Sequence, residues 1–130
     1  MMARIIVVED DADILGLVRH HLGKAGHKVI ATDSGERALE ILSEKDPPDV
    51  AVLDVGLPGM SGRELAMRIR ADERTSEVRI VFLTASIDPE DIEAAKELSD
   101  AYLTKPFIAS ALLATIERVC VPSDAEPEGW

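Results

Sequence analysis

The chain has 130 residues, 46% of them hydrophobic, which suits one compact domain with a buried core and leaves no room for a second. Its 25 acidic and 14 basic residues give a formal net charge of −11, which opposes direct binding to nucleic acid or to an anionic membrane. No apolar run approaches the roughly 20 residues that span a bilayer, and the start MMARIIVVED lacks a secretory signal, so we expect a cytoplasmic protein with no membrane partner.

Five short segments rich in Val, Ile and Leu have the pattern of parallel strands that are covered on both faces. In chain order they are Arg4–Val8, Lys28–Thr32, Val50–Asp54, Arg79–Thr84 and Ala101–Thr104. Apolar residues recur at helical spacing after each of them. The alternation of five strands with five helices predicts an α/β fold built on an open, doubly wound parallel sheet.

Local signals place the ends of the helices. Asp11 is a cap for the first helix and Gly26 follows it as a stop, while Ser34 caps the second and Pro89 opens the fourth. The apolar spacing also predicts which helical residues face the core. For the first helix these are Ile14, Leu17, Val18, Leu22 and Ala25, and for the fifth Ile108, Leu112, Thr115, Ile116 and Val119.

Polar residues follow four of the five strands. In a doubly wound sheet, sites gather at the carboxyl ends of the strands, near the switch in strand order. The residues at those ends are Glu9, Asp10 and Asp11 after the first strand, Asp54 after the third, Thr84 after the fourth and Lys105 after the fifth. Clustered carboxylates raise one another's pKa unless something neutralises them, and an all-oxygen site favours Mg²⁺.

The same set of groups suits phosphoryl chemistry. Gly56 can offer a backbone carbonyl because a residue without a side chain lets the chain approach closely. Lys105 supplies a mobile positive charge and Thr84 a hydroxyl donor. Asp54, at the carboxyl end of a buried strand, would then be the nucleophile that becomes an aspartyl phosphate.

Each of these residues also has a structural interpretation. Asp10 and Asp11 could be helix caps, and for Asp11 this is the favoured interpretation. Asp54 could form an Asx turn, Thr84 could be β-branched strand filler and Lys105 could be an ordinary surface residue. Taken together these interpretations weaken, because four separate strand ends would each place a phosphate-handling group by chance.

Four motifs, in this order and spacing, resemble the receiver domain of two-component response regulators from Ala3 to Val119. They are IIVVEDD at the start, AVLDVGLPGMSG in the middle, and VFLTA and YLTKPF toward the end. The resemblance implies a flavodoxin-like (βα)5 fold and a phosphorelay function. We expect the receiver domain to cover residues 1–121, with residues 122–130 as a flexible tail or a linker stub.

The resemblance implies that Asp54 accepts a phosphoryl group from a phosphohistidine on a sensor kinase or a histidine phosphotransfer protein. It implies Mg²⁺ held by Asp10, Asp54 and the carbonyl of Gly56, with Glu9 acting through water. Such a domain is a signalling phosphoacceptor rather than an enzyme, since it assists only its own phosphorylation and dephosphorylation.

The remaining motif residues would form a switch. By resemblance, Lys105 pairs with the phosphoryl oxygens, Thr84 hydrogen-bonds one of them, and the backbone amide of the small Ala85 reaches the phosphate. Tyr102 matches the switch aromatic that packs inward when Thr84 moves. The bond before Pro106 is often cis in this family. The output is partner binding by the face made of the fourth helix, the fifth strand and the fifth helix.

Two departures from the family pattern affect that face. Leu98, Ser99 and Asp100 stand where the family usually has Gly-Ala and an acidic residue, so the resemblance does not say where the fourth helix ends. Ala101 breaks an acidic pair that is frequent in transcription-factor receivers, and Arg118 is the one base on the fifth helix. These departures argue, though not strongly, against a regulator that binds DNA directly.

Two other functions compete with this interpretation. A Mg²⁺-dependent phosphatase of the haloacid-dehalogenase type would also use an aspartyl nucleophile, but it needs a second Asp two residues on, where this chain has Gly56. A docking module that never takes phosphate is the other alternative. The presence of the acceptor, the acidic pair, the threonine and the lysine speaks against it.

Overall fold

The computed structural model describes residues 2–85 and 88–120, so the predicted tail at 122–130 lies outside the described residues. The five strands have the predicted bounds: β1 Arg4–Val8, β2 Lys28–Thr32, β3 Val50–Asp54, β4 Arg79–Thr84 and β5 Ala101–Thr104. The helices between and after them are α1 Ala12–Lys24, α2 Gly35–Glu44, α3 Gly62–Ala71, α4 Pro89–Leu98 and α5 Ala109–Val119.

All strand pairs are parallel, in the order β2-β1-β3-β4-β5. The strand order reverses at β1, which lies between β2 and β3. The register places Val8 beside Leu53, and Asp54 beside Leu83. The ends of β1 and β4 therefore flank the end of β3, at the switch point where doubly wound sheets bind their ligands.

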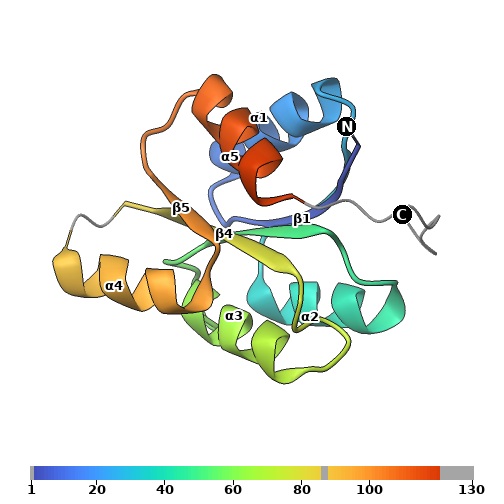
Figure 1. The fold of residues 1–130 in the computed structure, drawn as a ribbon, viewed down its shortest axis with the longest axis vertical. Helices are drawn as coiled ribbons and strands as arrows, with labels where there is room; N and C mark the ends of the chain where they lie inside the picture. Colours follow the sequence, from blue (N-terminus) through green and yellow to red (C-terminus); the bar gives the residue numbers. More distant parts are fainter. Residues whose placement is uncertain (1, 86–87, 121–130) are drawn as a thin grey trace.

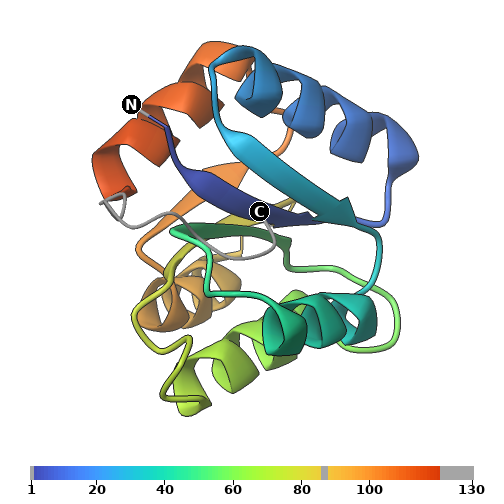
Figure 2. The ribbon, with the colours of Figure 1, turned by 90° about the vertical axis from the view of Figure 1, so that its right-hand side faces the viewer.

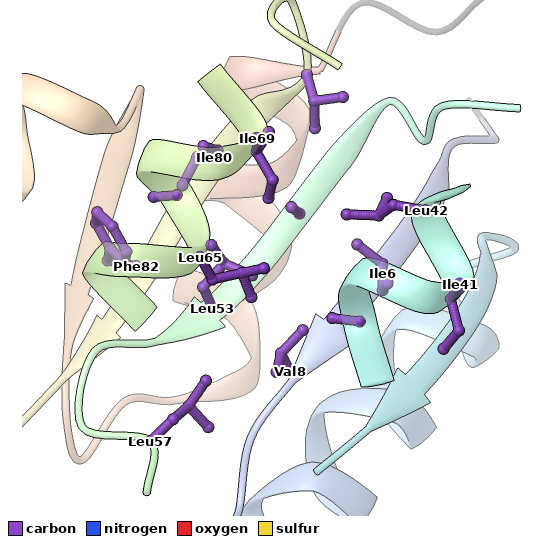
Figure 3. Close-up of a cluster of buried hydrophobic side chains, with 14 of the residues drawn as sticks. Ile6, Val8, Ile41, Leu42, Leu53, Leu57, Leu65, Ile69, Ile80 and Phe82 are labelled. Atoms are coloured by element: carbon purple, nitrogen blue, oxygen red, sulfur yellow. The ribbon is translucent and has the colours of Figure 1, made fainter. Parts of the chain in front are cut away.

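The sheet is covered on both faces, as the unbroken apolar strands predict. Helices α1 and α5 lie on one face, and α2, α3 and α4 on the other (Figures 1 and 2). Alternate strand residues point into the two layers. Ile6, Leu53 and Phe82 pack under α2–α4 (Figure 3), whereas Ile5 and Val52 pack under α1 and α5.

The predicted helix signals are confirmed. The Asp11 carboxylate accepts the N–H groups of Asp13 and Ile14 at 2.9 and 3.1 Å, and the Ser34 hydroxyl accepts that of Arg37 at 3.1 Å. Gly26 follows α1 with a φ of 97°, a conformation that favours glycine. Pro89 stands in the first turn of α4 behind an Asp88 cap.

Three residues predicted to face the core are exposed. Leu17 is 50% exposed and Ile108 69%, and Ala25 is exposed as the residue that ends α1. Ile108 is the residue before the first turn of α5, so it does not share that helix's buried stripe. On α1 the sheet and α5 bury Val18 and Leu22, a narrower stripe than the apolar pattern suggests.

The end of α4, which the family pattern left open, is fixed by polar contacts. The amide and hydroxyl of Ser99 both donate to the carbonyl of Ala95, at 3.0 and 2.7 Å. Arg70 from α3 donates to the carbonyl of Leu98 and to the Asp100 carboxylate. A side-chain network thus replaces the glycine stop that the family usually has.

Candidate functional site

Three of the predicted carboxylates meet at the carboxyl end of the sheet. Glu9, Asp10 and Asp54 each offer an oxygen within 4.8 Å of the others. They meet because β1 and β3 are neighbours and end at the same level. Glu9 is fully buried and Asp54 is 6% exposed, whereas Asp10 lies at the surface. Asp11 caps the first turn of α1, which confirms the interpretation of this residue as a helix cap.

Lys105 reaches this cluster from the end of β5. Its Nζ donates to Glu9 Oε1 at 2.5 Å and lies 3.4 Å from Asp54 Oδ1. Its backbone N–H donates to the carbonyl of Thr84 at 2.7 Å, and the bond to Pro106 is cis, as the resemblance implied. The Lys105 side chain is only 17% exposed. The interpretation of Lys105 as an ordinary surface residue is therefore wrong.

The surroundings of these groups set their charges. Burial raises the pKa of Glu9 to about 7, helped by a hydrogen bond with Asp54 and opposed by Lys105. Burial also acts to raise the pKa of Asp54, but hydrogen bonds from the Glu9 carboxyl and the Gly56 amide bring it below its usual value. Burial lowers the pKa of Lys105, yet contacts with Glu9 and Asp54 outweigh burial and raise it. The Lys105 ammonium thus lies between the Glu9 carboxyl and the Asp54 carboxylate and offsets negative charge in the cluster.

The donor set fits a hard divalent cation. Glu9 Oε2 is buried and has no hydrogen-bond partner among the described residues, so one carboxylate oxygen is left for a ligand or a water. The three carboxylates offer oxygen donors alone, and the exposed position of Asp10 leaves a side open to retained waters. This chemistry suits Mg²⁺.

Two glycines of the loop after β3 have different surroundings. A Cβ at Gly56 would meet Asp54 Oδ1 at an ordinary 3.8 Å, so close packing does not explain glycine there. A Cβ at Gly62 would lie 2.0 Å from the backbone oxygen of Asp54 and 2.8 Å from its carbonyl carbon. Gly62 lets α3 begin directly against the peptide of Asp54. The glycine-rich run GLPGMSG signals a tight loop, but not which glycine is in contact.

The predicted switch residues lie on the neighbouring strands. Thr84 is buried at the end of β4, one residue beyond Leu83, which pairs with Asp54, and the exposed Ala85 follows it. Tyr102 pairs with Phe82 in the sheet and is partly buried against the core under α2–α4. Thr84 and Tyr102 therefore sit on adjacent strands, one beside the acidic cluster and one toward α4.

This fold and acidic strand-end site define a phosphoacceptor signalling domain of the flavodoxin-like class. The family profile "Response regulator receiver domain" matches residues 5–117. The chain is 40% identical over 117 residues to the uncharacterized transcriptional regulatory protein YrkP of Bacillus subtilis, covering 89% of this chain and 48% of that protein. The chain belongs to the response regulator receiver family, and the prediction of a two-component receiver domain is confirmed.

Solved structures agree. The chemotaxis response regulator CheY4 of Vibrio cholerae matches with a TM-score of 0.85 at 32% identity, over 92% of this chain and 99% of that one. The receiver domain of sensor histidine kinase PA1611 from Pseudomonas aeruginosa PAO1, solved with a magnesium ion in its active-site cleft, matches with a TM-score of 0.82 at 27% identity, over 92% and 98%. The chain spans about half the length of the curated relatives it matches. Within residues 2–85 and 88–120, no helix has the length and apolarity that a membrane crossing requires.

Proposed function

We propose that Asp54 accepts a phosphoryl group from a phosphohistidine on a sensor histidine kinase or a histidine phosphotransfer protein. The observation that carries this proposal is the contact of Lys105 with both Glu9 and Asp54, at 2.5 and 3.4 Å, inside a cluster of three carboxylates. An ionised carboxylate beside a cation is what attack on a phosphoryl group requires.

In the transfer step, an oxygen of Asp54 bonds to phosphorus while the P–N bond to histidine breaks. The electron pair of that bond stays on the imidazole nitrogen. The lowered pKa of Asp54 keeps the attacking oxygen unprotonated, and the Lys105 ammonium pairs with the phosphoryl oxygens. The donor imidazole leaves as a neutral ring when its other nitrogen carries a proton, so no residue of the site has to act as a general acid.

The cation of this site would be Mg²⁺, held by Asp10, Asp54 and the carbonyl of Gly56, with Glu9 acting through water. When bound it neutralises charge between the carboxylates and the phosphoryl group. The orphaned Glu9 Oε2 and the all-oxygen donor set support this assignment. So does the magnesium ion in the receiver domain of PA1611, a protein of the same fold.

Phosphorylation would be read at the face made of α4, β5 and α5. Thr84 and the backbone amide of Ala85 would bind the phosphoryl oxygens, and Tyr102 would pack inward as Thr84 moves. The position of Tyr102 beside Phe82, on the strand next to Thr84, supports such a link. The partner would be a downstream effector protein or domain. Since the curated relatives bear the names of transcriptional regulators, a covalently attached effector domain is one form of this partner.

Intact-mass measurement after incubation with acetyl phosphate and Mg²⁺ tests the proposal. We expect one phosphoryl group per chain, absent in Asp54→Asn and retained in the control Asp11→Asn, whose side chain caps α1 outside the cluster. Phosphate release over many turnovers on diverse phosphate esters would favour the phosphatase instead. An unmodified wild-type chain would favour the docking module.

A further inference from the structure

A contact between α2 and the loop after β3 has no part in the function described so far. Glu36, the second residue of α2, accepts the backbone N–H of Met60 at 2.9 Å through its Oε1. The Met60 amide holds the pKa of Glu36 below its usual value. Met60 belongs to the loop that carries Gly56, so this hydrogen bond joins α2 to the loop of the acidic site.

The two segments approach closely because a glycine stands on each side. Gly59 has a φ of +71°, which favours glycine, and a Cβ there would lie 3.1 Å from Glu36 Oε1. Across the contact, a Cβ at Gly35 would lie 3.2 Å from the Cβ of Met60 and 3.3 Å from its backbone oxygen. The start of α2 is thus fitted to this part of the loop.

The rest of the loop is held by other means. The N–H of Val55 donates to Leu83 at 3.0 Å, and the N–H of Gly62 donates back to Val55 at 3.1 Å, which closes the base of the loop. Leu57 is buried in the core under α2–α4 (Figure 3). Beyond Leu57, the partly buried Met60 packs on the same core, and the exposed carboxylate of Glu36 fixes the Met60 backbone.

We propose that Glu36 is a positioning residue that holds this loop in the conformation that presents the Gly56 carbonyl and Asp54 for cation binding and phosphoryl transfer. Glu36 itself touches neither the cation nor the phosphoryl group. A backbone ligand can be placed only by placing its loop, and a loop ordered before binding loses less entropy when the ligand arrives. This inference rests on the proposed function of Asp54.

Three variants test it. Glu36→Ala removes the acceptor, Glu36→Gln keeps a neutral oxygen that can accept the Met60 N–H, and Glu40→Ala is the matched control. Glu40 is a carboxylate on the same helix, paired with Arg37 at 2.7 Å on an exposed face. Each variant is measured for Mg²⁺ affinity by calorimetry, for phosphorylation rate with acetyl phosphate, for amide hydrogen exchange at Met60 and for melting temperature.

For Glu36→Ala we expect faster exchange at Met60 and Mg²⁺ binding weaker by roughly tenfold, the low end for outer partners of metal ligands. Phosphorylation should slow by a similar factor. Glu36→Gln should recover most of each loss, and Glu40→Ala should match the wild type. A merely structural role would lower the melting temperature without changing Mg²⁺ affinity, and that result would overturn the proposal.

The outcome also separates this inference from the proposed function. If the wild type takes phosphate at Asp54 and Glu36→Ala binds Mg²⁺ and reacts as the wild type does, the inference on Glu36 is wrong and the proposed function stands. If the wild type neither binds Mg²⁺ nor takes phosphate, the proposed function fails, and with it the inference on Glu36.

Discussion

Gly62→Ala tests how the position of the acceptor is set. The new Cβ would lie 2.0 Å from the backbone oxygen of Asp54, whereas ordinary contact begins at 3.4 Å, so one backbone would have to retreat by about 1.4 Å. The atoms opposing it belong to the backbone and cannot turn aside as a side chain would. We expect the free energy of unfolding to fall by about 2–3 kcal/mol, the upper part of the usual range for overpacking.

For a chain of 130 residues, this loss lowers the melting temperature by roughly 8–12 °C. Because the displaced peptide is that of Asp54 itself, phosphorylation by acetyl phosphate should slow as well, by up to roughly a hundredfold for a shift of this size. Calorimetric or spectroscopic melting gives the first quantity and intact-mass time courses give the second.

Gly56→Ala is the matched control, since its Cβ would make only an ordinary contact of 3.8 Å with Asp54 Oδ1. It should change stability by less than about 1 kcal/mol. A Gly62→Ala protein as stable as Gly56→Ala and as reactive as the wild type would refute the reasoning that α3 abuts the acceptor's backbone.

Two further predictions concern ligand and proton linkage. Mg²⁺ at a hundredfold above its dissociation constant should add about 2.7 kcal/mol of stability, a rise of roughly 10 °C in melting temperature. The Asp10→Asn variant should show no such rise, and without metal it should be more stable than the wild type. An unchanged wild-type melting curve would count against the metal site. His27 accepts the Ala3 N–H at Nδ1, and burial lowers the pKa of His27 below the usual 6.5. The contribution of neutral His27 to stability is therefore complete above pH 6.5 and is lost as the pH falls below that value. The raised pKa of Glu9 acts in the opposite direction, because stability is lost as the pH rises through about 7. The quantity to measure is therefore the difference in melting temperature between the wild type and His27→Asn, a variant that keeps an acceptor without titrating. As the pH falls from about 7.5 to 5, the wild type should lose more melting temperature than His27→Asn does. Parallel curves would contradict the lowered pKa of His27.

The strands were predictable because each is an unbroken apolar run that ends at a polar residue. Parallel strands buried on both faces leave little freedom in their bounds, and the residues after them must meet at one edge of the sheet. The order of the elements therefore predicts that Glu9, Asp10, Asp54 and Lys105 lie close together, as they do in the structure.

The features that the sequence does not predict depend on how closely segments far apart in the sequence approach one another. The exposure of Leu17 depends on how much of α1 the sheet and α5 cover, which the helix's own periodicity does not encode. The roles of Gly62 and Glu36 depend on how closely α3 and α2 come to the loop after β3. Sequence spacing likewise could not show that the Lys105 ammonium reaches both Glu9 and Asp54.

In the proposed function, the side chain of Asp54 becomes an acyl phosphate. Borohydride reduces an aspartyl phosphate to homoserine, so reduction after treatment with acetyl phosphate and Mg²⁺, followed by peptide mapping, locates the modified residue. Homoserine at position 54, and its loss when Mg²⁺ is withheld, is the predicted result. Phosphorylated protein that yields homoserine at another position, or none at all, would contradict the assignment of Asp54 as the acceptor.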